Sequence, residues 1–222
     1  MSNLMVVDRL NYNDHGPVHA RITAGSSLEI FNLITRKVRP TIVDLGLAGI
    51  IDSKIVTLSG SYLHDIGNCV HRVEHIMHSC YLAAPILDRL YGKFYSDDSS
   101  LAQRLKTETL HCIYAHEDAI KALSIEAGTA KVADGSDMAE GRARIPYRMG
   151  RVEMHSISAL SIKRVEIETG DDKPVKIKVH MTNPAGIYQL EEVMGKKLET
   201  SGIQDYVEIV ALENGVELKT MS

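Results

Sequence analysis

Apolar residues recur at helical spacing through most of the first 150 residues. From residue 17 to about 37 they fall three or four positions apart, and Pro17 suits the first position of a helix. A second helix is predicted from a cap at Asp52 to Gly67, a third over residues 71–91 and a fourth over 101–123. The pattern therefore predicts an all-helical N-terminal part.

The pattern changes near Gly150. From Ile162 apolar and polar residues alternate in two runs separated by a turn at 170–172, which predicts a hairpin. Asn183-Pro184 then opens a helix that stops near Gly202, and two short strands follow around 207–211 and 216–218. The fold class is thus mainly α. We expect a helical domain over residues 1–150 and a small α+β domain of ββαββ type over 151–222, the latter accessory or used for dimerisation.

Composition narrows the class of protein. The chain is 44% hydrophobic and 24% charged, which is ordinary for a globular protein. No run approaches the roughly 20 apolar residues of a membrane span, and no signal pattern opens the chain, so we expect a cytoplasmic protein. The net charge of -4 gives no reason to expect a nucleic-acid partner. The three cysteines show no CxxC spacing, which predicts neither a disulfide framework nor a zinc knuckle.

The ten histidines change this picture, because several lie close to one another or beside acidic residues. Imidazole and carboxylate are natural ligands for divalent transition metals. Residues 71, 75 and 78 share one face of the third predicted helix. His116 belongs to the core-facing stripe of the fourth, with His111 rotated about 140° from it. In chain order the candidates are His19, His64, Asp65, His71, His75, His78, His111, His116 and Asp134.

This order resembles the HD superfamily of metal-dependent phosphohydrolases, which are helical and carry a first His, an HD doublet and a last Asp. The segments YNDHGPVHA, YLHDIGN and KVADGSDM are similar to its motifs, and the likeness covers most of residues 10–150. The resemblance implies that one metal ion is held by His19, His64, Asp65 and Asp134. Asn68 departs from the family, since many relatives carry Lys or His there, and this leaves the substrate subclass open.

The surplus histidines resemble the dinuclear variant of the family. There Asp65 would bridge to a second ion bound by His75 and His116, with His71 as a further ligand candidate. His78 and His111 are expected to be structural, and Asp137 is expected to orient a ligand. Each candidate has an ordinary alternative: His19 as a surface residue at a helix start, His75 and His116 as hydrogen-bonded histidines, and Asp134 as a cap.

The resemblance implies hydrolysis of a phosphomonoester or phosphodiester of a nucleotide or related small molecule, with His64 and Asp65 at the centre of the chemistry. Two divalent transition metal ions, Mn, Fe, Co, Ni or Zn, are the expected cofactors, and no organic cofactor site is predicted. Arg142 and Arg144 lie in an arginine-rich segment after the last ligand. They are interpreted equally as substrate-phosphate ligands or as residues fastening the two domains.

Two other functions fit the same residues. Some HD relatives resemble diiron oxygenases, for which turnover would depend on oxygen. A non-catalytic sensor of metal or nucleotide is the third reading, with the small domain sensing a ligand or dimerising. The sequence leaves a homo-oligomer open.

Overall fold

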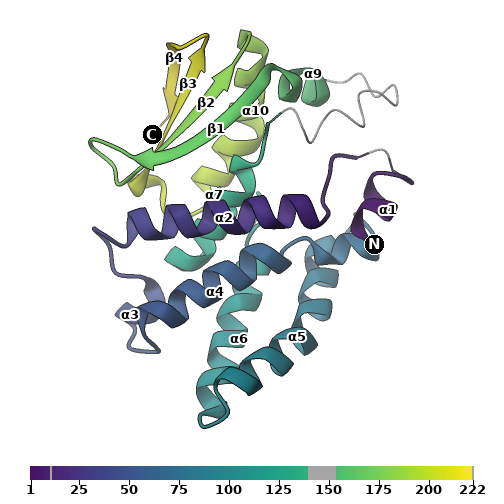
Figure 1. The fold of residues 1–222 in the computed structure, drawn as a ribbon, viewed down its shortest axis with the longest axis vertical. Coiled ribbons are helices and arrows are strands. Elements are labelled where there is room, and N and C mark those ends of the chain that lie inside the picture. The colour runs from purple at the N-terminus through teal and green to yellow at the C-terminus, as the bar shows by residue number, and fades with distance from the viewer. Residues whose placement is uncertain (11, 140–153, 222) are drawn as a thin grey trace.

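The computed structural model describes residues 1–10, 12–139 and 154–221. It confirms a mainly α protein with a small C-terminal sheet (Figure 1). The N-terminal elements are α1 (Ser2–Val6), α2 (Pro17–Ile34), α3 (Thr41–Asp44), α4 (Ile50–Leu63), the 3-10 helix η1 (Ile66–Cys69), α5 (His75–Phe94), α6 (Ser99–Tyr114) and α7 (Ile125–Ser136). The C-terminal elements are α9 (Met154–Ser161), β1 (Ile162–Thr169), β2 (Val175–Met181), η2 (Pro184–Gly186), α10 (Ile187–Gln189), η3 (Leu190–Gly195), α11 (Lys196–Glu199), η4 (Gln204–Tyr206), β3 (Val207–Glu213) and β4 (Val216–Met221).

Helix α4 differs from its prediction at both ends. It begins two residues before Asp52, whose Oδ2 accepts the Gly49 N–H at 2.9 Å and so stabilises the first turn. It ends at Leu63, and the chain continues into η1 instead of running as one helix to Gly67. A Cβ at Gly67 would lie 2.1 Å from the carbonyl oxygen of His75, so this glycine allows η1 to lie directly against α5.

Two further helix ends are shifted. Helix α5 begins at His75, because the preceding Glu74 has a left-handed φ of 58°. Residue 71 therefore lies before the helix and does not share a helical face with His75. Helix α6 ends at Tyr114, so His116 stands just beyond it.

The sheet has the strand order β1-β2-β3-β4. The predicted β1–β2 hairpin is antiparallel, and so is the β3–β4 pair, where Asn214 and Gly215 form the turn with φ of 49° and 87°. Strand β3 is parallel to β2 because the segment between them crosses over the sheet. The single helix predicted there is divided into α10, the π-helical η3 and α11.

Two apolar clusters form the core, and α7 contributes to both. In the first, Val132 of α7 and Ile30 of α2 pack with the inward residues of the sheet, such as Ile177. In the second, Ala127 and Ala130 of α7 pack with residues of α3 to α6. Figure 1 shows the sheet on one side of α2 and the helices α4 to α6 on the other. The predicted domain boundary near residue 150 lies outside the described residues, and the division stays a prediction.

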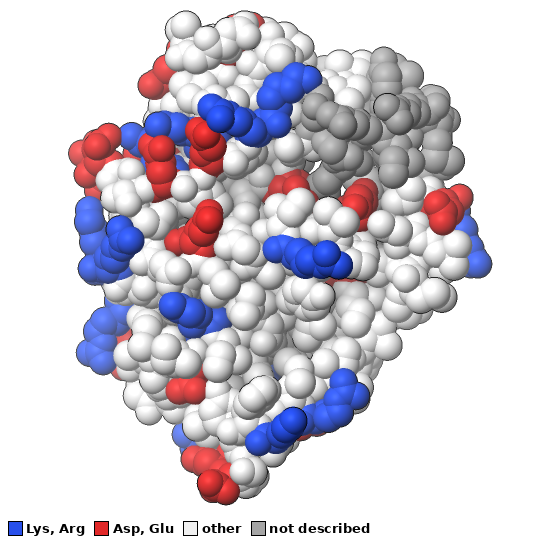
Figure 2. All heavy atoms as spheres, in the orientation of Figure 1, with Lys and Arg blue, Asp and Glu red and all other residues white. Residues whose placement is uncertain are grey.

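In the part of the chain that the structure describes, no helix combines the length and the apolar character that a membrane crossing requires. On the face drawn in Figure 2, basic and acidic side chains are interspersed among uncharged residues.

Candidate metal centre

A group of buried histidines and aspartates lies where α2, α4 and α7 meet. His19 comes from the first turn of α2, His64 caps the end of α4, and Asp134 lies in the last turn of α7. Asp65 follows His64 in a non-helical conformation, with φ of -105° and ψ of 7°. His19 and His64 are each 1% exposed, Asp65 is 5% exposed and Asp134 is 9% exposed. These four residues are the ones that the sequence motifs single out, and the fold brings them together.

Their donor atoms converge on one point. The Nε2 atoms of His19 and His64 are 3.1 Å apart. Asp134 Oδ1 lies 3.1 Å from His19 Nε2 and 3.4 Å from His64 Nε2. Asp65 Oδ2 lies 3.4 and 3.3 Å from the same two nitrogens.

These spacings fit a metal ion. Ligand bonds of about 2.1 Å place neighbouring donors about 3.0 Å apart in an octahedron and about 3.4 Å apart in a tetrahedron. The measured range of 3.1 to 3.4 Å agrees with both. The buried His/Asp cluster could therefore hold a metal ion.

The other oxygen of Asp65 faces a second pair of histidines. His75 Nε2 lies 3.4 Å from Asp65 Oδ1, and His116 Nε2 lies 3.8 Å from the same oxygen. The two imidazole nitrogens are 3.2 Å apart. Asp65 thus divides its two oxygens between two groups of donors. Arg72 also reaches this end, with Nη1 3.1 Å from His75 Nε2.

Three of the imidazoles are fixed by acceptors on their other nitrogen. His19 Nδ1 lies 2.7 Å from Asp137 Oδ2, His64 Nδ1 lies 2.7 Å from the Ser61 carbonyl oxygen, and His116 Nδ1 lies 2.5 Å from the Ile113 carbonyl oxygen. An Nδ1–H donated to each acceptor leaves the Nε2 lone pair directed at the cluster. This is the tautomer that metal binding through Nε2 requires. Asp137 thus contacts one of the candidate ligands, and its role in orienting a ligand stays a prediction.

The electrostatics favour positive charge at the first group. Burial would lower the pKa of His64, but Asp65 and Asp134 raise it to about 10. Burial would raise the pKa of Asp65, but His64 and His15 hold it well below its ordinary value. Burial lowers the pKa of His116 well below the usual range, with His64 adding to the effect, which favours the neutral imidazole. The carboxylates favour a cation beside His64 Nε2, where a metal ion would replace the proton.

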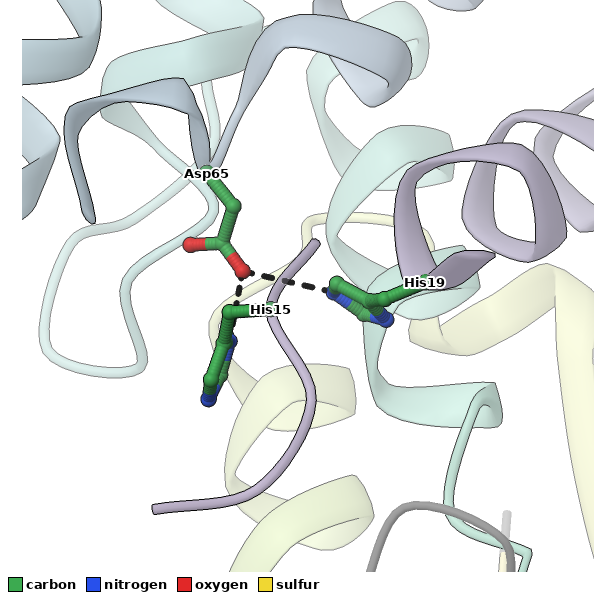
Figure 3. Close-up of side chains that lie close together, drawn as sticks. All are labelled: His15, His19 and Asp65. Atoms are coloured by element: carbon green, nitrogen blue, oxygen red, sulfur yellow. Dashed lines mark hydrogen bonds and ion pairs between the residues drawn. The ribbon is translucent and has the colours of Figure 1, made fainter. Parts of the chain in front are cut away.

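His15 also belongs to this cluster, although sequence reasoning missed it. Its Nδ1 lies 2.6 Å from Asp65 Oδ2, next to His19 (Figure 3). The backbone N–H of His15 donates to Asn3 Oδ1 of α1 at 3.2 Å, so the N-terminal helix holds this segment in place. The available signal was its position four residues before His19, in the same motif. His15, His19 and Asp65 form a further group that could hold an ion.

Two more polar residues complete the surroundings of the ligands. Asn68 donates from Nδ2 to Asp65 Oδ1 at 2.8 Å. The residue at which the chain departs from the expected Lys or His thus contacts a candidate ligand. Lys197, from the C-terminal segment, lies 2.9 Å from Asp134 Oδ2. Burial would lower the pKa of Lys197, but Asp134 and Asp118 raise it to about 12. No motif or spacing in the sequence points to this lysine.

Not every candidate reaches the cluster. His71 is exposed, and its Nδ1 accepts the Val73 N–H at 2.9 Å, because α5 starts only at His75. This placement gives no support to His71 as a ligand. His111 Nε2 accepts the Leu123 N–H at 3.0 Å, in a structural contact. Arg142 and Arg144 lie outside the described residues.

Comparison with known proteins gives one informative result. The chain is 47% identical over 212 residues to the uncharacterized protein MJ1020 of Methanocaldococcus jannaschii, which covers 95% of this chain and 81% of that protein. No family model matches the chain, and no solved structure matches it. The identity and coverage are high enough to establish common descent. The chain therefore belongs to the same family as MJ1020.

Proposed function

We propose that this protein is a metal-dependent phosphohydrolase of the HD superfamily. Its substrate would be a phosphomonoester or phosphodiester of a nucleotide or related small molecule. The observation that carries the proposal is the position of Asp65, whose Oδ2 faces His19 and His64 while its Oδ1 faces His75 and His116. A carboxylate shared in this way is what a site for two metal ions requires.

The donor set supports divalent transition metals as the cofactors. One ion would be held by His19, His64, Asp65 and Asp134, and the second by Asp65, His75 and His116. Imidazole-rich ligation favours Mn, Fe, Co, Ni or Zn over Mg or Ca. When bound, such ions lower the pKa of a water molecule and neutralise charge on phosphoryl oxygens.

Other residues of the chain would orient the metal ligands and bind the substrate. Backbone carbonyls and Asp137 fix the imidazole rings, and Asn68 fixes the bridging carboxylate. Burial of the ligands keeps bulk water from competing for them. Arg142 and Arg144 are proposed to bind the substrate phosphate, since a guanidinium matches two phosphate oxygens.

The test begins with metal analysis of the purified protein, followed by a phosphate-release screen over nucleotides and small phosphate esters with each metal. We expect up to two equivalents of metal and metal-dependent release of phosphate or of a nucleotide. Asp65→Ala should lose both, because it contacts every group of donors. His111→Ala is the matched control: it removes a histidine that bonds only the backbone of Leu123 among the contacts described, and it should retain metal and activity.

Two other outcomes would redirect the proposal. A protein that binds two irons and consumes oxygen during turnover, without releasing phosphate, would be an oxygenase on the same scaffold. A protein that binds metal and a phosphorylated ligand without converting it would be a sensor. Full activity of Asp65→Ala would remove the proposed site altogether.

A further inference from the structure

Lys197 connects the C-terminal segment to the metal centre. It lies on the four-residue helix α11 and is only 8% exposed. Its ammonium group has three acceptors: Asp134 Oδ2 at 2.9 Å, Asp118 Oδ1 at 2.9 Å and the His116 carbonyl oxygen at 2.7 Å. The three N–H donors of a lysine are thereby satisfied.

The surroundings are shaped to admit this side chain. A Cβ at Gly135 would lie 3.0 Å from Lys197 Cδ and 2.8 Å from Met194 Sδ, so the glycine leaves room for the lysine to reach Asp134. A buried ammonium group is costly unless it is paired and hydrogen-bonded. Here two carboxylates and a carbonyl meet that requirement, and one carboxylate is a candidate metal ligand.

The ion pair with Lys197 determines which oxygen of Asp134 faces the candidate metal ligands. Lys197 binds Oδ2, while Oδ1 faces His19 and His64 at 3.1 and 3.4 Å. A carboxylate held by one oxygen cannot rotate freely, so the other oxygen keeps its direction.

Lys197 also holds the segment that carries His116. This histidine lies beyond the end of α6, where no helix fixes its backbone. The same segment is bound by Thr200, whose Oγ1 donates to the Asp118 carbonyl oxygen at 2.9 Å and whose carbonyl accepts the Ala122 N–H at 2.9 Å. Residues 197–200 therefore fasten the loop from which the second group of donors receives His116.

We infer that Lys197 is a positioning residue of the metal centre, which orients Asp134 and holds the His116 loop so that the C-terminal segment takes part in metal binding. The inference rests on the metal centre of the proposed function, and it does not depend on which substrate is used. It gives the C-terminal segment around Lys197 a role in the metal centre.

The test compares Lys197→Met with Lys131→Met. Lys131 is a neighbouring buried lysine that binds Thr200 Oγ1 and the carbonyl oxygen of Ile120, four residues beyond His116. Unlike Lys197, it makes no hydrogen bond to the backbone of His116 or to a candidate ligand among the described residues. After metal removal, Co²⁺ and Zn²⁺ are titrated into the full-length proteins, and the visible spectrum of the Co²⁺ form is recorded. Lys197→Met should weaken metal binding by roughly 10- to 100-fold and change the Co²⁺ spectrum. Lys131→Met should bind metal as the wild type does.

Lys197→Gln serves as a second variant that should also weaken metal binding, because its side chain is one atom shorter, carries no charge and has two N–H donors for the three acceptors. It decides the question if Lys197→Met does not fold. Wild-type affinity and spectrum in a folded Lys197→Met or Lys197→Gln protein would overturn the inference, as would an equal loss in Lys131→Met. If the wild type binds no metal, both the proposed function and the inference fail. If it binds metal but releases no phosphate, the phosphohydrolase proposal fails and the titration still tests Lys197.

Discussion

The contact between Asp137 and His19 allows a quantitative prediction about metal affinity. Asp137 and His19 are 8% and 1% exposed, and Asp137 Oδ2 lies 2.7 Å from His19 Nδ1. A hydrogen bond to a charged group contributes about 1.5 to 3 kcal/mol, and each 1.4 kcal/mol corresponds to a tenfold change in an equilibrium constant. Asp137→Ala should therefore weaken metal binding by roughly 10- to 100-fold, which is also the usual effect of removing the partner of a metal-binding histidine. Asp137→Asn should lose less, because its amide oxygen still accepts the bond.

The assay is calorimetric titration of metal-free protein with Zn²⁺ or Co²⁺, supported by competition with a chelating dye. Ser136→Ala is the matched control, since this neighbouring hydroxyl donates to the Ala133 carbonyl oxygen at 2.7 Å. Circular dichroism checks that each variant is folded. If Asp137→Ala binds metal within twofold of the wild type while His64→Ala loses it, Asp137 does not orient His19 in the manner argued.

Three further predictions follow from other residues. His116→Ala should lose one equivalent of metal and most activity while keeping the other ion; fully active wild type with a single equivalent at saturation would refute the dinuclear site. If Arg142 and Arg144 bind substrate, neutralising either should lower kcat/KM by roughly ten- to a hundredfold at unchanged melting temperature, whereas a fastening role should lower the melting temperature instead. Burial lowers the pKa of Lys131 from 10.5 to about 8 in the folded protein, and the positive charge of Lys197 adds to this effect. Between pH 8 and 10.5 the unfolded chain therefore binds more protons than the folded protein, so the free energy of unfolding should rise with pH across this window. Lys131→Met should not show this rise. Denaturant titrations that give the same pH profile for both proteins would contradict the prediction.

The apolar pattern predicts the long helices and the sheet, because each element buries one face and therefore carries apolar residues at a regular spacing. The ββαββ order followed from alternation and from turn residues such as Asn214 and Gly215. The ends of helices were predicted less well. Glu74 gave no sign of its left-handed conformation, and the predicted helix therefore ran back to His71. The sequence predicts Asp52 as the cap of α4, whereas in the structure Gly49 is the cap and Asp52 supports it from the first turn.

The candidate site was predictable as far as motifs extend. His19, His64, Asp65 and Asp134 could be named because their order along the chain resembles a known family. Lys197 could not, because its contact with Asp134 depends on how the crossover segment packs against α7, and nothing local in its sequence records that packing. The apolar cluster that α7 shares with the sheet is what brings the two segments together.

The periodicity of the sequence does not predict the directions of several candidate ligands, and the reason is geometric. Most ligands of the proposed centre lie at or just beyond the ends of helices: His64 at the end of α4, His75 at the start of α5 and His116 after α6. A residue beyond the end of a helix no longer follows the turn of about 100° per residue, so the helical period does not predict where its side chain points. Asp65 lies outside helical geometry altogether, between α4 and η1. That position allows one carboxylate to face two groups of histidines, and no regular period along the chain could have revealed it.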